Sequence, residues 1–102
     1  MSIGYMYILE CSDGTFYTGS TKNLERRIEE HNSPDRGANY TRVRQPIELV
    51  YYEEYERIDW AFYREKQVQK WSQKKKLALI EGEPELLPKL AKKVFRKKKE
   101  RM

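Results

Sequence analysis

Two tyrosine-containing triplets near the start of the chain carry side chains that could take part in phosphodiester chemistry. Tyr5-Met6-Tyr7 and Tyr17-Thr18-Gly19 flank an Asp13-Gly14 turn signal, and Arg27 and the single histidine, His31, follow in the next predicted helix. Short connections between an apolar strand, an aromatic strand and this helix should bring the groups together. Phenols beside an arginine and a histidine are suited to proton transfer and phosphate binding.

Each tyrosine taken alone is better explained as an aromatic residue of a β-sheet. For a phenol to act as a general base near neutral pH, its pKa of roughly 10 must be lowered by nearby cations or by a metal-polarised water. Arg27, Lys22 and a cation bound at Glu65 would supply that field.

Glu65 lies on the apolar stripe of a predicted helix, where a charge is unexpected. Ala61, Val68 and Ser72 define this stripe, and Glu65 is four residues after Ala61. A carboxylate on a buried face is costly unless it is ion-paired, hydrogen-bonded or bound to a metal. A structural pair with Arg27 is one explanation. The other is a hard cation, because Mg²⁺ tolerates a single protein carboxylate when waters and substrate phosphate complete its octahedron.

The preceding helix places a cation and the histidine beside its own apolar stripe. Leu24 and Ile28 form the stripe, and helical geometry puts Arg27 and His31 on its flanks, one turn apart. An arginine aimed toward the sheet needs a partner, for which phosphate and Glu65 are the candidates, or it extends outward from the edge of the core. For His31, a helix-terminal cap or a satisfied core group is the simpler explanation.

The strands that must position these residues can be read from periodicity. Ile3 to Glu10 is apolar or aromatic on both faces, which predicts a central strand. Asp13-Gly14 predicts a hairpin into a second strand over Thr15 to Thr18, with Gly19 ending the pairing. Pro46 opens a third strand through Tyr55. The pattern favours a small antiparallel sheet.

Helix start and stop signals divide the rest of the chain. Thr21 is the predicted N-cap of the first helix, which Asn32-Ser33-Pro34 ends. Asp35 to Gln45 is predicted to be a loop. A second helix begins near Asp59, its predicted cap, runs through about Trp71 and continues toward Ile80. After a boundary at Gly82 and Pro84, the spacing of apolar residues from Leu86 to Arg101 predicts a basic amphipathic helix.

Composition narrows the classes of protein and partner. The 102 residues suffice for one small domain, with 36% charged and 13% aromatic residues. The chain lacks an apolar run of membrane-spanning length and a signal-peptide pattern, so we expect a cytoplasmic protein. Cys11 is the single cysteine and His31 the single histidine, which excludes an internal disulfide and a zinc site of three or four nitrogen and sulfur ligands.

A net charge of +5 and a pI near 9.3 favour a polyanionic partner. Basic residues interleaved with Tyr40 and Trp71 would suit a phosphate backbone with aromatic stacking, although charge runs are more often solvated surface. The predicted nucleic-acid-binding residues are Lys22, Arg26, Arg36, Arg42, Arg44, Lys74 and Lys75.

From Gly4 to about Ile80, the chain resembles the GIY-YIG nuclease superfamily, and more closely its small stand-alone UPF0213 group. Tyr5-Met6-Tyr7 stands at the GIY triplet and Tyr17-Thr18-Gly19 at the YIG triplet. The downstream positions of the family are matched by Arg27, His31 and Glu65. An asparagine that many of these nucleases carry after the glutamate has no counterpart, because Asn39 is the last asparagine.

The resemblance implies an α/β domain of the α+β type, with a three-stranded antiparallel sheet flanked by helices, and a metal-dependent nick of DNA by in-line attack of water. It implies that Glu65 holds one Mg²⁺ or Mn²⁺ ion and Arg27 grips the scissile phosphate. Tyr17 would take the proton from the attacking water, Tyr7 would orient or share that role, and His31 would hydrogen-bond a phenol or the phosphate.

We therefore expect residues 1–82 to form the GIY-YIG-like domain and residues 83–102 a basic C-terminal helix. The expected function is a metal-dependent DNA endonuclease of low sequence specificity that selects branched, flapped or single-stranded DNA, as in repair or recombination. A non-catalytic nucleic-acid-binding module is the first alternative. A protein-interaction domain that docks through the terminal helix is the second.

Overall fold

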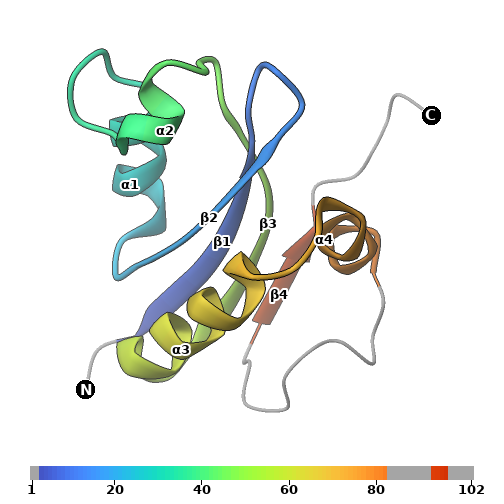
Figure 1. Ribbon diagram of the computed structural model, residues 1–102. Coiled ribbons are helices and arrows are strands. Elements are labelled where there is room, and N and C mark those ends of the chain that lie inside the picture. Colours follow the sequence, from blue (N-terminus) through green and yellow to red (C-terminus); the bar gives the residue numbers. More distant parts are fainter. Residues whose placement is uncertain (1–2, 83–92, 97–102) are drawn as a thin grey trace.

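The computed structural model describes residues 3–82 and 93–96, which form an antiparallel sheet with helices packed on it (Figure 1). The strand order is β2-β1-β3-β4. The strands are β1 (Gly4–Glu10), β2 (Phe16–Thr21), β3 (Glu48–Tyr55) and β4 (Lys93–Arg96). The helices are α1 (Leu24–His31), α2 (Asn39–Arg42), α3 (Ile58–Gln69) and α4 (Gln73–Ile80).

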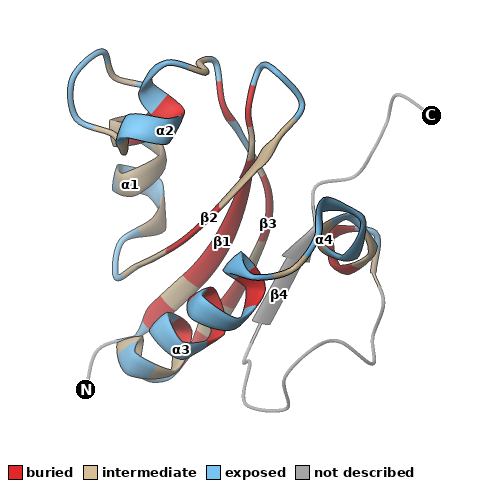
Figure 2. Ribbon diagram, in the orientation of Figure 1, coloured by how far each residue is buried: buried red, intermediate tan, exposed pale blue. Residues whose placement is uncertain are grey.

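The central strand β1 is buried on both faces, as its sequence predicts (Figure 2). Met6 and Ile8 pack with residues of β3, α3 and α4. Tyr7 and Leu9 point the other way, into a second cluster that α1 covers with Leu24 and Ile28 among its contacts. The sheet is therefore the middle layer between α1 on one face and α3 with α4 on the other.

The predicted hairpin at Asp13-Gly14 is confirmed. Gly14 has a φ of +86°, a conformation that only glycine adopts without strain, and the Asp13 carboxylate accepts hydrogen bonds from the backbone and hydroxyl of Thr15. The prediction that Gly19 ends the pairing is wrong, because β2 continues to Thr21 and Gly19 pairs with Tyr7. Continued pairing holds Gly19 directly beside the central strand.

Two predicted helix caps are also wrong by a few residues. Asn23, not Thr21, caps α1, since its side-chain oxygen accepts the Arg26 backbone N–H at 3.0 Å. α3 begins at Ile58, and Asp59 lies inside its first turn, ion-paired with Arg57 at 2.8 Å. The predicted continuation toward Ile80 is a separate helix, α4, which Ser72 caps.

Further differences between the predictions and the structure concern the segment predicted to be a loop and the predicted C-terminal helix. The predicted loop from Asp35 to Gln45 contains the short helix α2. The three predicted strands are joined by a fourth, since Lys93–Arg96 pair with β3 instead of continuing the helix predicted for Leu86 to Arg101. The rest of that predicted helix lies outside the described residues. Among the helices described, none is long and apolar enough to span a bilayer.

Candidate active site

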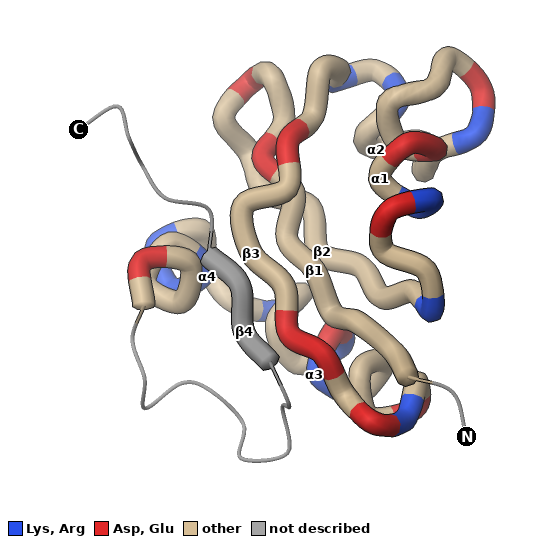
Figure 3. Tube along the Cα trace, turned by 180° about the vertical axis from the view of Figure 1, so that it is seen from behind, with Lys and Arg blue, Asp and Glu red and all other residues tan. Residues whose placement is uncertain are grey.

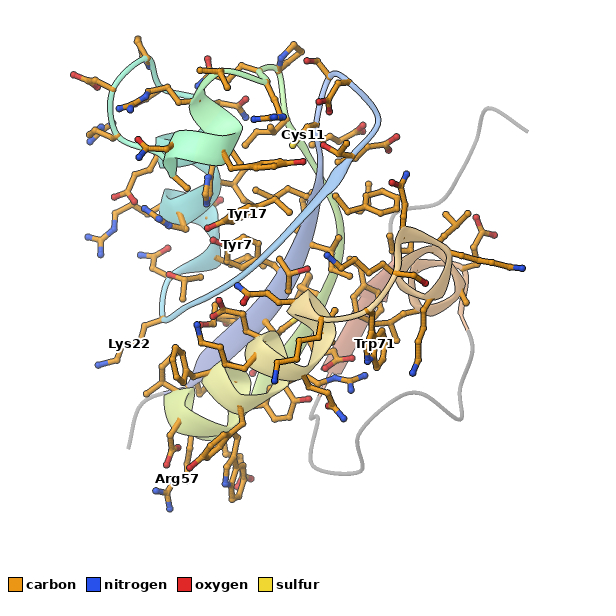
Figure 4. The ribbon with its side chains drawn as sticks, viewed as in Figure 1. Tyr7, Cys11, Tyr17, Lys22, Arg57 and Trp71 are labelled. Carbon is orange, nitrogen blue, oxygen red and sulfur yellow. The ribbon has the colours of Figure 1, made fainter. Side chains whose placement is uncertain are left out.

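Two glycines, Gly19 in the second triplet and Gly4 just before the first, allow close approaches that shape the site. Tyr7 pairs with Gly19 across the β1–β2 ladder, and a Cβ on Gly19 would lie 2.5 Å from the Tyr7 hydroxyl. Any larger residue at position 19 would clash with the Tyr7 phenol, which packs directly against Gly19 of β2. A Cβ on Gly4 would likewise lie 2.5 Å from the Cα of Ile58, at the start of α3. Figure 4 shows Tyr7 and Tyr17 close together beside β2, on the side of α1.

A buried chain of hydrogen bonds runs from β1 through α1 to α2. The Tyr7 hydroxyl lies 2.9 Å from Nε2 of His31, and Nδ1 of His31 lies 2.7 Å from the Thr41 hydroxyl. Thr41 uses its own proton to donate to the Ala38 carbonyl at 3.1 Å, so its oxygen must accept from His31. Neutral His31 therefore carries its proton on Nδ1, and Nε2 accepts the hydrogen bond from Tyr7.

Burial sets the protonation of this chain. It lowers the pKa of His31 to about 4, with Arg27 acting in the same direction, so the imidazole is neutral at pH 7. Burial also raises the pKa of Tyr7 and of Tyr17, although the Arg27 guanidinium opposes the rise at both phenols. The lowered phenol pKa expected from nearby cations is thus absent in the protein alone, because desolvation outweighs the field of one arginine.

Arg27 is partly buried and pairs with its own helix. Its guanidinium donates to Glu30 at 2.7 Å, one turn along α1. The alternative of a structural ion pair between Arg27 and Glu65 is not what the structure shows. Arg27 nonetheless lies close enough to Tyr7 and Tyr17 to influence the pKa of both phenols. This pair is partly exposed to solvent, which weakens it and leaves the guanidinium available to a phosphate.

Glu65 is 8% exposed and lies where α3 meets β2. One carboxylate oxygen accepts from the Ser20 hydroxyl at 2.5 Å, and the other accepts from the Gln69 amide at 2.6 Å. The Gln69 amide also donates to the Thr18 carbonyl at 3.3 Å, which ties α3 to β2. No described side chain gives Glu65 a cationic partner, so its charge is hydrogen-bonded but not neutralised.

The structure brings together the five predicted catalytic residues. Both tyrosine rings contact the His31 ring, with centroids 5.8 Å away for Tyr7 and 5.2 Å away for Tyr17. Both phenols lie within the electrostatic influence of Arg27 and Glu65. Of this group, Tyr17 is half-buried, and no described residue hydrogen-bonds its hydroxyl. Its oxygen is the phenol oxygen left available for a reacting group.

Tyr5 does not belong to this group, although it stands in the first triplet. Its ring packs edge-on against Tyr52, with centroids 5.7 Å apart. It lines a hollow of about 510 Å³ that also includes Leu24 and Ile28 and none of the five catalytic candidates. Alternation of side chains along β1 places neighbouring odd-numbered tyrosines on one face, but only Tyr7 lies opposite Gly19.

The seven predicted nucleic-acid-binding residues do not form one surface. Lys74 and Lys75 lie on α4, at the side of the sheet remote from α1 and α2 in both views (Figures 1 and 3). Arg44 is paired with Asp13 at 3.0 Å and Arg26 lies 4.0 Å from Glu30. The remaining members, exposed near α1 and α2, are Lys22, Arg36 and Arg42.

The two aromatic residues expected to stack on bases already contact other side chains, although Tyr40 is 37% exposed. The Tyr40 ring stacks on Tyr17 at 6.0 Å and carries the Arg44 guanidinium 3.9 Å from its centroid. Trp71 lies against the core, with Arg64 and Lys75 over its ring. The Tyr40 ring therefore contributes to packing around the site, and the Trp71 ring contributes to packing around α4.

Three residues next to the site were not anticipated from the sequence. Gln69 follows Glu65 by one helical turn, so its contact could have been inferred from spacing. Ser20 directly follows the second triplet, but its role depends on β2 continuing past Gly19. Thr41 lies in a segment predicted to be a loop, and nothing in its local sequence marks it as a partner of His31.

Comparison with known families gives the class of protein. The GIY-YIG catalytic domain matches residues 3–78, which include both triplets and all five catalytic candidates. The chain therefore belongs to the GIY-YIG family, a family of nucleases that act on nucleic acid and generally depend on a divalent metal.

Within this family the chain is similar to UPF0213 proteins. One from Syntrophus aciditrophicus is 49% identical over 85 residues, covering 83% of this chain and 98% of the relative. One from Staphylococcus aureus is 45% identical over 80 residues, covering 78% of this chain and 96% of the relative. The solution NMR structure of a UPF0213 protein from Bacillus halodurans superimposes with a TM-score of 0.51 at 41% identity, covering 81% of this chain and 89% of that one.

Proposed function

We propose that the protein is a DNA endonuclease that hydrolyses one phosphodiester bond at the site formed by Tyr7, Tyr17, Arg27, His31 and Glu65. The observation that carries the proposal is the Glu65 carboxylate, which is almost fully buried beside two phenols and an arginine. A buried charge without a cationic partner is costly in a structural role. It is suited to holding a cation that arrives with the substrate.

The Glu65 carboxylate fits one Mg²⁺ or Mn²⁺ ion. No described cluster of three or more carboxylate, histidine or cysteine side chains could enclose a metal, so protein would supply a minor part of the coordination. Mg²⁺ accepts that arrangement, because it retains waters and binds substrate phosphate oxygens. When bound, the ion polarises the phosphate and stabilises the charge that develops on the leaving oxygen.

Arg27 is suited to hold the scissile phosphate. Its guanidinium is always charged and can exchange the half-exposed Glu30 for two phosphate oxygens. Binding there would place the phosphorus next to Tyr17, whose pKa Arg27 already influences. Positioning of this kind supplies much of the rate enhancement in phosphoryl transfer.

We assign the base role to Tyr17. Its phenolate would take a proton from the water that attacks phosphorus, while the bond from phosphorus to the departing sugar oxygen breaks. The accessible hydroxyl of Tyr17 supports this assignment, whereas the Tyr7 hydroxyl is buried and donates to His31. Tyr7 and His31 then serve as positioning residues that hold Arg27 and the strand register. Because burial raises the pKa of Tyr17, the nicking rate should increase with pH across the neutral and alkaline range.

Low sequence specificity follows from the absence of an obvious base-reading element in the described residues. The exposed cations near α1 and α2 can contact phosphates of any sequence. A protein that reads the backbone selects the shape or strandedness of DNA, so branched, flapped or single-stranded DNA is the proposed substrate.

The test is nicking of supercoiled plasmid and of a flapped oligonucleotide by wild-type protein and Glu65→Gln, with Mg²⁺, Mn²⁺ or EDTA. Loss of the carboxylate should lower the nicking rate at least about 100-fold, or about 2.7 kcal/mol, and leave DNA affinity unchanged or higher. Glu29→Gln, at an exposed position of α1, is the matched control and should nick normally. Equal nicking by Glu65→Gln would exclude the metal role.

The same experiment separates the endonuclease from a nucleic-acid-binding module. Binding with a steep salt dependence but no metal-dependent product from wild-type protein would favour the module.

A further inference from the structure

One face of α3 beside Glu65 combines an exposed aromatic ring with unpaired cations. Phe62 precedes Glu65 by three residues and Lys66 by four, so all three lie on adjacent parts of one helical face. Glu65 is hydrogen-bonded to Ser20, which fixes this face against the β2 edge. Arg64 turns the opposite way, to Glu53 on β3. The face that carries Phe62 therefore borders the catalytic residues.

Phe62 is 48% exposed, and the Lys66 ammonium lies 4.8 Å from its ring centroid. Neither Lys66 nor Lys70, one turn further along, forms an ion pair with a described carboxylate. Two acidic residues of α3 lie near this face: Asp59, which is paired with Arg57 at 2.8 Å, and Glu65, whose single charge is exceeded by the two lysines. The local charge is positive, which complements a phosphate backbone.

The ring of Phe62 differs from the other aromatic rings that the sequence offered for stacking. Tyr40 is 37% exposed, but its ring already stacks on Tyr17 and carries the Arg44 guanidinium, and Trp71 packs against the core with Arg64 over its ring. Among the described residues, the ring interaction of Phe62 is with the ammonium group of Lys66. The Lys66 ammonium can move from the ring to a phosphate oxygen, because its four-carbon stem allows both positions.

We propose that Phe62, with Lys66 and Lys70, is a platform that stacks one unpaired base next to the phosphate held at Glu65 and Arg27, so that the preferred substrate is DNA with a single-stranded segment at the cut. This rests on the proposed endonuclease function and specifies its substrate class. Base–aromatic stacking tolerates any sequence but requires that the base has left the duplex. Stacking on Phe62 thus selects strandedness without reading sequence.

The experiment measures binding of wild-type protein, Phe62→Leu and Tyr63→Leu in EDTA, so that no cutting occurs. Each is titrated at one ionic strength with a single-stranded oligonucleotide that carries 2-aminopurine, and with the matching duplex. Tyr63 is the matched control, since it is 72% exposed but a hundred degrees further round the helix.

Phe62→Leu should weaken single-strand binding at least about fivefold and reduce 2-aminopurine quenching, with duplex affinity unchanged. Tyr63→Leu should behave as wild type on both. Equal losses on single strand and duplex, no loss for Phe62→Leu, or the same loss for Tyr63→Leu would each overturn the platform. These results do not depend on nicking. Equal nicking by wild-type protein and Glu65→Gln, or no metal-dependent product from wild-type protein, would be a separate failure, of the proposed function.

Discussion

The two buried glutamates of this small domain, Glu53 and Glu65, differ in how their charge is accommodated. Glu53 on β3 is 0% exposed and accepts hydrogen bonds from the hydroxyls of Tyr51 at 2.6 Å and Tyr55 at 2.7 Å. Arg64 completes this network as a buried ion-pair partner at 3.1 Å. Its charge is neutralised within the fold.

Glu65, the next residue after Arg64, accepts only neutral donors from Ser20 and Gln69 among the described residues. One turn of one helix thus presents an arginine to β3 and an unneutralised carboxylate to β2. A saturated buried ion pair serves the fold, whereas a buried carboxylate without a cation is poised for a ligand. The difference separates the half of α3 that pairs with β3 from the half to which we assign the metal site.

The largest expected effect is on stability when Glu53 is neutralised. Glu53→Gln removes the carboxylate that pairs with the buried Arg64 and should lower the free energy of unfolding by about 3–5 kcal/mol. Glu65→Gln should leave it unchanged or raise it, because an uncompensated buried charge is removed. Urea denaturation measures both. A larger loss for Glu65→Gln than for Glu53→Gln would reverse the assigned roles.

A smaller effect comes from the neutral Tyr7–His31–Thr41 chain, which contrasts with the charged Glu53 network. The folded pKa of His31, about 4, lies below its ordinary value of 6.5, so the unfolded chain binds more protons between these values. Stability should be full above pH 6.5 and fall by about 2 kcal/mol from pH 6.5 to pH 5. Thermal or urea unfolding across this range measures the slope. The His31→Gln variant should lack this dependence of stability on pH. An unchanged slope in the variant would show that His31 does not cause it.

Removing one hydrogen-bond donor should cost more stability at Glu53 than at Glu65. Tyr55→Phe removes a hydroxyl from the fully buried Glu53 and should cost about 1.5 kcal/mol of stability. Ser20→Ala should cost about 0.5 kcal/mol, because Glu65 retains Gln69 and borders the exposed edge of β2. Matched denaturation curves decide the order, and equal costs would show that both carboxylates depend equally on their donors.

A further small effect concerns Thr41, which fixes the His31 tautomer. Thr41→Val removes the acceptor for the Nδ1 proton and should cost about 1 kcal/mol of stability. The ¹⁵N shifts of the ring should then show a mixture of tautomers, whereas Thr41→Ser should retain the wild-type spectrum. A wild-type tautomer signature in Thr41→Val would mean that Tyr7 alone holds the ring.

Much of the frame that positions the site follows from sequence. The two-sided apolar pattern of β1 and the Asp13-Gly14 turn are local signals, and both lead directly to the observed hairpin. Glu65 was recognisable as a charge on an apolar helical stripe. Glu53 carries the same kind of signal, because this carboxylate alternates with Tyr51 and Tyr55 on one strand face.

The remaining parts depend on contacts between segments distant in sequence. Three side-chain contacts join residues whose local sequence does not specify a partner. They are the Arg64–Glu53 ion pair and the Thr41–His31 and Ser20–Glu65 hydrogen bonds. The raised pKa of both phenols in the protein without metal does not follow from local sequence for a similar reason, since burial is a property of the assembled core. The fourth strand likewise arises from pairing with β3 rather than from a local signal.

The most direct test of the contrast between Glu65 and Glu53 is a Mg²⁺ titration of protein labelled at the glutamate carboxyl carbons, with a single-stranded oligonucleotide present. The Glu65 carboxyl signal should shift and saturate, that of Glu53 should stay in place, and assignment by Glu65→Gln identifies the moving signal. A Glu65 signal that does not move, or one that moves no more than that of Glu53, would contradict the assignment of Glu65 as the metal-binding carboxylate.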